Sequence, residues 1–102
     1  MLYELITPIK FDGSEVKEVN LNLEDLCGRD VRKATKQFKM LNKGFLGVVH
    51  LEEEFLCLIA ANASGKPVEF FDSIRSYDFY NILWEVQSFL LAPRATLSET
   101  SV

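Results

Sequence analysis

Residues 3–38 read YELITPIKFDGSEVKEVNLNLEDLCGRDVRKATKQF, and this stretch decides the fold. Apolar and polar side chains alternate on both sides of Asp12 and Gly13. Alternation is typical of strands with one wet face, and an Asp-Gly pair supplies the positive φ angles of a tight hairpin turn. The stretch therefore predicts a hairpin over about residues 2–23, with Pro8 favouring an edge position.

After the hairpin, apolar residues recur at the spacing of a helix. The first helix is predicted over about residues 28–42, with an apolar stripe on Val31, Ala34, Thr35, Phe38 and Leu41. Further helices are predicted at about residues 51–63, 68–73 and 77–91, the last with Ser76 as its N-cap. The fold class is thus α+β, a small N-terminal β-hairpin followed by a compact bundle of three to four α-helices.

The composition indicates one ordinary globular domain. The chain has 102 residues, of which 48% are hydrophobic and 25% charged. We expect residues 1–92 to form a single domain and residues 93–102 a flexible C-terminal tail. Apolar runs fall far short of the roughly 20 residues that span a bilayer, and the N-terminus lacks the pattern of a signal peptide. These features predict no membrane partner and a cytoplasmic location.

Catalytic and metal-binding signatures are missing from the sequence. Cys27, Cys57 and His50 are too few ligands for a closed zinc site, and we interpret both cysteines as buried thiols. The acidic residues near the predicted helix starts suit the helix dipole without any catalytic role, and no glycine loop is present to hold a phosphate. We therefore expect a protein that is not an enzyme and has no cofactor.

The first predicted helix is strongly basic. It and its end contain six of the eleven basic residues of the chain, namely Arg29, Arg32, Lys33, Lys36, Lys39 and Lys43. Outside residues 29–43 the chain has five basic and 14 acidic residues, a formal charge of −9. The basic residues are interpreted as a solvated surface, as a contact with an acidic face of the next subunit, or as a site for nucleic acid. The subunit contact ranks above nucleic acid, since the whole chain has a net charge of −4.

The last predicted helix is apolar around more than half of its circumference, so it is either central in the fold or shared with another subunit. Phe70, Phe71, Tyr80 and Trp84 are our candidates for a contact with another subunit or with a partner. The alternative for each of these residues is a place in the core, because a small domain needs several rings inside.

Several segments together resemble a known family. They are the hairpin with Thr7-Pro8-Ile9 and Asp12-Gly13, the link LEDLCGRD at residues 23–30, and the stretch FLCLIAANASGKPVEFFDSIRSYDFYNILWEVQSFL at residues 55–90. In order and spacing they are similar to the small tail assembly chaperones of long-tailed bacteriophages and prophages, over about residues 3–91.

The resemblance implies a protein that is not an enzyme and acts in the cytoplasm of the bacterial host. Such a protein self-associates as a ring or spiral, coats the tape measure protein until the tail tube polymerises, and is absent from the mature virion. The tail tube protein and a frameshift-extended form of the chain are further candidate partners. A small nucleic-acid-binding or regulatory module that uses the basic helix face is the alternative function.

Cys27 departs from the family pattern, which often has threonine at this position. A threonine there would be a good N-cap, and loss of such a cap costs about 1 kcal/mol. We therefore expect the start of the first helix to be less secure than the resemblance implies.

Overall fold

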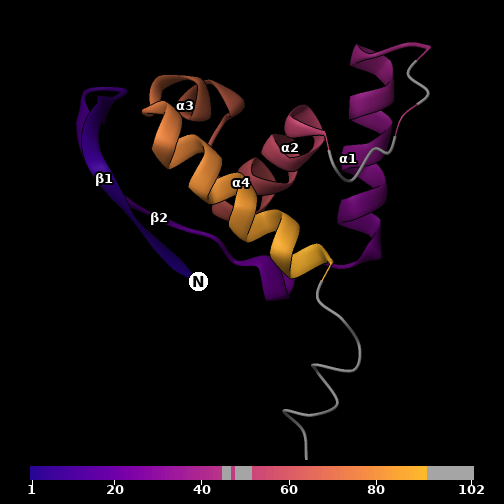
Figure 1. The fold of residues 1–102 in the computed structure, drawn as a ribbon, viewed down its shortest axis with the longest axis horizontal. Coiled ribbons are helices and arrows are strands. Elements are labelled where there is room, and N and C mark those ends of the chain that lie inside the picture. Colours follow the sequence, from indigo (N-terminus) through magenta and orange to yellow (C-terminus); the bar gives the residue numbers. More distant parts are fainter. Residues whose placement is uncertain (45–46, 48–51, 92–102) are drawn as a thin grey trace, which may run out of the picture.

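A computed structural model describes residues 1–44, 47 and 52–91, and it confirms the α+β class. A two-stranded hairpin flanks the helices on one side, and the first helix lies at the opposite side (Figure 1). The elements in chain order are β1 Leu2–Phe11, β2 Ser14–Asn20, a 3₁₀ turn η1 Leu23–Asp25, α1 Gly28–Leu41, α2 Glu53–Ser64, α3 Val68–Ser73 and α4 Ser76–Leu90.

The hairpin is antiparallel and closes at the predicted turn. Asp12 and Gly13 have φ angles of 54° and 82°, the left-handed conformation that a tight hairpin turn requires. The register shifts between Glu4 and Ile9, so that β1 has extra residues that β2 does not match. This irregularity frees backbone N–H groups of β1 from the ladder, and they find another acceptor.

The second strand is shorter than predicted, because it ends at Asn20 rather than near residue 23. The partner strand β1 begins at Leu2, which pairs with Asn20. After Asn20 the backbone N–H groups therefore donate to acceptors outside the two paired strands. The N–H of Leu21 donates to the Met1 carbonyl at 2.7 Å, and the N–H of Asn22 donates to the carbonyl of Ala63 in α2 at 3.1 Å. The hairpin is thereby joined to the helical part of the fold.

The central helix is α2, which packs against α1, α3 and α4. Phe55 and Ile59 of α2 are buried, and the apolar faces of the hairpin and the other helices surround them. Helix α4 packs on α2 and on β1 and leaves its outer face exposed. Helix α4 therefore has one face in the core and one face in contact with solvent, and its sharing with another subunit stays a prediction.

The start of α1 is held despite the missing hydroxyl. The backbone N–H of Cys27 donates to a carboxylate oxygen of Asp30 at 3.0 Å, and the Cys27 thiol lies 3.5 Å from the same oxygen. The hydrogen bond from the backbone N–H is the main reason that the pKa of Asp30 is below its usual value. Asp30 thus supplies one half of a capping box, and the other half rests on a weakly bonding sulfur.

The start of α4 differs by one residue from the prediction. The helix begins at Ser76 with Arg75 as its N-cap, and no side chain caps it. Ser76 is therefore the first helical residue rather than the cap.

No helix in the described part of the chain is long and apolar enough to span a membrane.

Candidate functional site

The four aromatic candidates divide into two buried and two exposed residues. Phe70 and Phe71 are 0% and 1% exposed and pack edge to face, with ring centroids 5.2 Å apart. Phe70 also meets Phe11 of β1 edge to face at 5.4 Å. Side chains this deeply buried offer no surface to a partner, so Phe70 and Phe71 belong to the core alternative.

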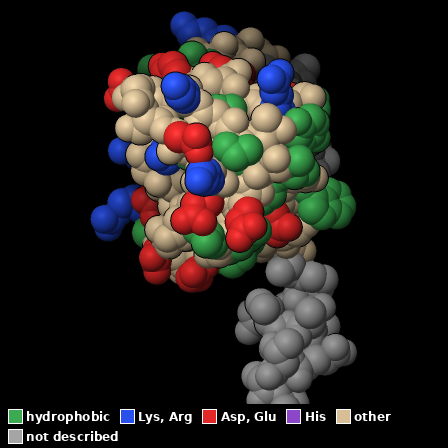
Figure 2. All heavy atoms as spheres, turned by 90° about the vertical axis from the view of Figure 1, so that its left-hand side faces the viewer, with side chains coloured by type: hydrophobic (Ala, Val, Ile, Leu, Met, Phe, Trp, Pro, Cys, Tyr) green, Lys and Arg blue, Asp and Glu red, His purple; other side chains and the backbone are tan. Residues whose placement is uncertain are grey.

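Tyr80 and Trp84 are 55% and 66% exposed on the outer face of α4. Tyr77 and Leu91 are also exposed. Spacings of three and four residues place Tyr77, Tyr80 and Trp84 along one line of the helix, and Leu91 is the residue directly after its end. We call Tyr77, Tyr80, Trp84 and Leu91 the outer stripe of α4. Figure 2 shows that hydrophobic side chains gather along one edge of the face seen from the hairpin side, while charged side chains cover its centre and its other edge.

Two hydroxyl groups fix the outer stripe in place. The Tyr80 hydroxyl donates to a carboxylate oxygen of Glu53 in α2 at 2.9 Å, and this hydrogen bond is the main cause of the raised pKa of Tyr80. The Tyr77 hydroxyl shares a hydrogen bond with the hydroxyl of Thr7 in β1. The rings therefore remain exposed while their polar ends are anchored, which reduces the entropy that a partner must overcome on binding.

The basic face of α1 is exposed along its whole length. Its members are Arg29, Arg32, Lys33, Lys36, Lys39 and Lys43. None of the six forms an ion pair with another described residue. The face points away from α2, because Ala34 and Phe38 on the other side of α1 are the buried residues of this helix. Exposure of the predicted basic residues is thus confirmed, and their role stays a prediction.

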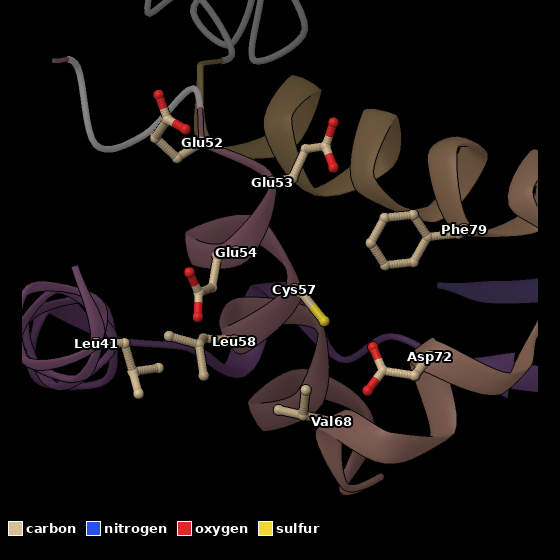
Figure 3. Close-up of a pocket in the computed structure, with 9 residues that line it drawn as sticks. All are labelled: Leu41, Glu52, Glu53, Glu54, Cys57, Leu58, Val68, Asp72 and Phe79. Atoms are coloured by element: carbon tan, nitrogen blue, oxygen red, sulfur yellow. The ribbon is translucent and has the colours of Figure 1, made fainter.

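An acidic hollow lies between the ends of four helices, and no sequence pattern predicted it (Figure 3). It has a volume of about 790 Å³ and is lined by Leu41, Glu52, Glu53, Glu54, Cys57, Leu58, Val68, Asp72 and Phe79. Four carboxylates and five apolar side chains thus share one surface. Within the described part of the chain these carboxylates have no cation as a partner, although Glu54 accepts a hydrogen bond from Asn42 at 2.7 Å.

Comparison with known proteins identifies the family. A family model described as "Phage tail assembly chaperone proteins, E, or 41 or 14" matches residues 2–91. The chain belongs to the phage tail assembly chaperone family. Searches of curated proteins and of solved structures found no significant match. The family assignment therefore rests on the match to the family model.

The chaperone has a buried carboxylate that the sequence analysis did not predict. Asp78 is the one charged side chain that is buried within the described residues, with 0% exposure. It accepts hydrogen bonds from the Tyr3 hydroxyl at 2.8 Å and from the backbone N–H groups of Ile6 and Thr7 at 2.9 and 3.2 Å. These N–H groups are those that the register shift of β1 frees from the ladder.

A signal for Asp78 was present in the sequence. Ile82 and Val86 follow it at intervals of four residues, so Asp78 lies on the buried side of the predicted helix. A carboxylate on such a face needs donors. Asn81 adds a further link, since its side-chain amide donates to the Tyr3 hydroxyl at 3.1 Å. This cluster joins the chaperone's hairpin to α4 and is structural.

The two cysteines of the chaperone differ. Cys57 is buried, as expected, and burial is the main cause that raises its pKa to about 11. Cys27 is exposed, so its interpretation as a buried thiol is wrong. The reason is its position before the first turn of α1, where the side chain faces solvent instead of the core.

Some predicted residues lie outside the described part of the chaperone. They are His50, the first residue of the helix expected at 51–63, and the expected tail at 93–102. Three of the acidic side chains near the helix starts have contacts with other described residues. Asp30 binds the Cys27 backbone, Glu53 binds Tyr80 and Glu54 binds Asn42.

Proposed function

We propose that this tail assembly chaperone self-associates and coats the tape measure protein, keeping it soluble until the tail tube polymerises. The observation that carries the proposal is the outer stripe of α4. Exposed apolar side chains that lie together on a small soluble domain indicate a binding surface. Large aromatic residues such as Trp84 and Tyr80 also contribute disproportionately to the binding energy of protein interfaces.

The chemistry of the expected partner fits this stripe. A tape measure protein is expected to be long and helical with at least one apolar face, which would aggregate when left uncovered in water. The three rings from Tyr77 to Trp84 span about 10 Å of the helix, and together with Leu91 at its end they can lie along such a partner helix. We therefore assign the outer stripe to the tape measure protein, and we assign contacts between subunits to the charged surfaces.

The proposal also includes where the chaperone acts. It works in the cytoplasm of the bacterial host and leaves before the virion is complete, because the tail tube replaces it on the tape measure protein. The tail tube protein and a frameshift-extended form of the chain are further proposed partners. Covering an apolar helix requires no bond to form or break, so the proposed function needs no catalytic group, metal or cofactor.

Solubility on co-expression tests the proposed function. The tape measure protein of the same phage is produced alone, with the chaperone, or with the Trp84→Glu variant, and its soluble fraction is measured. We expect the chaperone to raise the soluble fraction several-fold and Trp84→Glu to abolish most of this gain. Phe89→Glu is the matched control, since Phe89 is an exposed ring of the same helix about 140° away from Trp84 around the axis.

Two results would count against the proposal. If the chaperone leaves the tape measure protein insoluble, tape measure binding is wrong. If Trp84→Glu and Phe89→Glu both preserve the effect, binding does not use the outer stripe. Circular dichroism of each purified variant shows whether the helices are intact, so a misfolded variant is recognised.

Nucleic-acid binding is kept as the second candidate because of the exposed basic face of α1. Its six cations match a phosphate backbone in charge, and such binding weakens steeply as salt increases. We expect no DNA or RNA binding at 150 mM salt in a gel-shift titration. Binding at that salt concentration that Lys33→Glu with Lys36→Glu abolishes would instead favour this candidate.

A further inference from the structure

Within the part of the chain that the structure describes, the chaperone carries two surfaces of opposite charge with no ion pair between them. We propose that the basic face of α1 in one copy docks into the acidic hollow of the next copy. This inference rests on the proposed self-association and specifies which surfaces make it. The contact joins two different surfaces, so a pair of copies still has a free hollow on one copy and a free basic face on the other.

The basic side of this contact also has an apolar member. Arg29, Lys33, Lys36 and Met40 follow one another at intervals of three or four residues and share one line of the helix. Met40 is 74% exposed, the highest value among the exposed large apolar side chains of the described residues. This line is about 17 Å long from Arg29 to Met40. It therefore presents cations together with one apolar side chain to a partner.

The acidic hollow has the complementary composition. Figure 3 shows the Asp72 carboxylate directed toward Cys57 and the Glu54 carboxylate beside Leu58 on the side of Leu41. Lysine and arginine side chains suit such a surface, because their aliphatic parts pack on apolar atoms while their charged ends reach the carboxylates. Met40 can occupy an apolar part of the same hollow, which would remove its large exposed area from water.

The negative field of the hollow has an effect inside the protein as well. After burial, the charges of Asp72 and Glu54 are the next causes of the raised pKa of the Cys57 thiol. The same two carboxylates attract a cationic partner that binds in the hollow.

A second copy fits better than a contact within the chain or another partner. Leu41 of α1 lines the hollow of its own chain, while the basic face of the same helix is directed to solvent. The basic segment of residues 29–43 has a charge of +5, and the rest of the chain has a charge of −9. Each copy thus carries both a basic and an acidic surface, so two copies can bind each other. A contact between unlike surfaces closes into a ring or continues as an open spiral.

Reversing the charge of each surface by substitution tests the inference. One variant carries Lys33→Glu with Lys36→Glu, and the other carries Glu52→Lys with Asp72→Lys. Among the described residues no hydrogen bond is found for the side chains of Glu52 or Asp72, and Asp72 is exposed, so their replacement breaks no hydrogen bond within the chain. Light scattering after size-exclusion chromatography measures the mass of each variant as a function of concentration, and circular dichroism verifies the fold.

We expect each variant alone to associate at least about tenfold more weakly than the wild type, because each then opposes like charges. An equimolar mixture is expected to recover association, since the acidic α1 of one variant meets the basic hollow of the other. Glu4→Lys with Glu18→Lys is the matched control. These two residues face each other across the hairpin, change the net charge by the same amount as the hollow variant, and lie away from both surfaces. We expect this control to associate like the wild type.

The outcomes distinguish this inference from the proposed function. If the wild type associates but the variants do so equally well, or if the mixture does not recover association, the inference is wrong and self-association stands. If the wild type stays a monomer at all concentrations, self-association and this contact both fail, whereas tape measure binding is judged by its own experiment. A carbodiimide cross-link between Lys36 and Glu52 or Asp72 of differently isotope-labelled copies would locate the contact directly.

Discussion

Two charged regions of the chaperone differ in burial and in the number of their hydrogen bonds and ion pairs. The carboxylate of Asp78 is buried and accepts three hydrogen bonds from β1. The six cations on the basic face of α1 are exposed and have no ion pair with a described residue. The difference teaches which charges the fold itself needs. Asp78 holds the hairpin on α4, whereas the cations of α1 contribute little to the monomer and are available to a partner.

The aromatic residues show the same division, and replacing them should have the largest effect. Phe70→Ala removes a fully buried ring that packs on Phe11 and Phe71, so we expect it to lower the free energy of unfolding by about 3–5 kcal/mol. Trp84→Ala should change it by no more than about 0.5 kcal/mol, because this ring is mostly exposed. Urea unfolding followed by circular dichroism measures both. Equal losses would mean that Trp84 is part of the core.

The second largest effect is expected at Asp78. Asp78→Ala leaves the N–H groups of Ile6 and Thr7 without their acceptor, so we expect a loss of about 2–4 kcal/mol. Asp78→Asn keeps one acceptor oxygen and should lose less. Asp72→Ala is the control, since it removes an exposed carboxylate and should have an effect within about 0.5 kcal/mol. A loss in Asp78→Ala as small as in this control would contradict the structural role of Asp78.

The sequence was sufficient for features that depend on neighbours along the chain. The hairpin turn at Asp12 and Gly13 and the helical spacing of α1 are local patterns, and both were predicted. The exposure of the basic face followed from its position opposite the apolar stripe. Such features need no knowledge of how the elements pack.

Features that depend on contacts between distant segments were not predicted. The N–H groups that the register shift of β1 frees donate to Asp78, about 70 residues later in the chain. The acidic hollow combines residues from the ends of separate helices, so no single stretch carries its pattern. Phe70 and Phe71 could not be distinguished from Tyr80 and Trp84, because the packing of the short helix α3 decides which rings are covered.

A smaller effect on stability is expected at the start of α1, where two substitutions of the exposed residue Cys27 can be compared. Cys27→Thr restores a hydroxyl acceptor for the first turn, so we expect the free energy of unfolding to rise by up to about 1 kcal/mol. Cys27→Ala is the control and should change it much less, because the Cys27 backbone N–H still donates to Asp30. Thermal unfolding measures both variants. A lower stability of Cys27→Thr would show that the thiol is the better cap.

The smallest effect is the pH dependence that Asp30 provides. The hydrogen bond from the Cys27 backbone lowers the pKa of Asp30 below its usual value of 3.8, so the ionised carboxylate favours the folded state. Its contribution is full at pH values above the unfolded pKa and is lost as the pH falls through the lower folded pKa. We expect the difference in stability between the wild type and Asp30→Asn to be constant near neutral pH and to vanish in acid. A difference that grows in acid would contradict this.

Side-chain footprinting with hydroxyl radicals tests most directly whether the exposed surfaces are the contact surfaces. The oxidation rates of Trp84, Tyr80 and Met40 are measured by mass spectrometry in the dilute chaperone, in the concentrated chaperone and in its complex with the tape measure protein. We predict that Met40 becomes protected on self-association and that Trp84 and Tyr80 become protected in the complex, while Phe70 is unreactive throughout. Trp84 that oxidises as fast in the complex as in the free chaperone would contradict the assignment of the outer stripe to the tape measure protein.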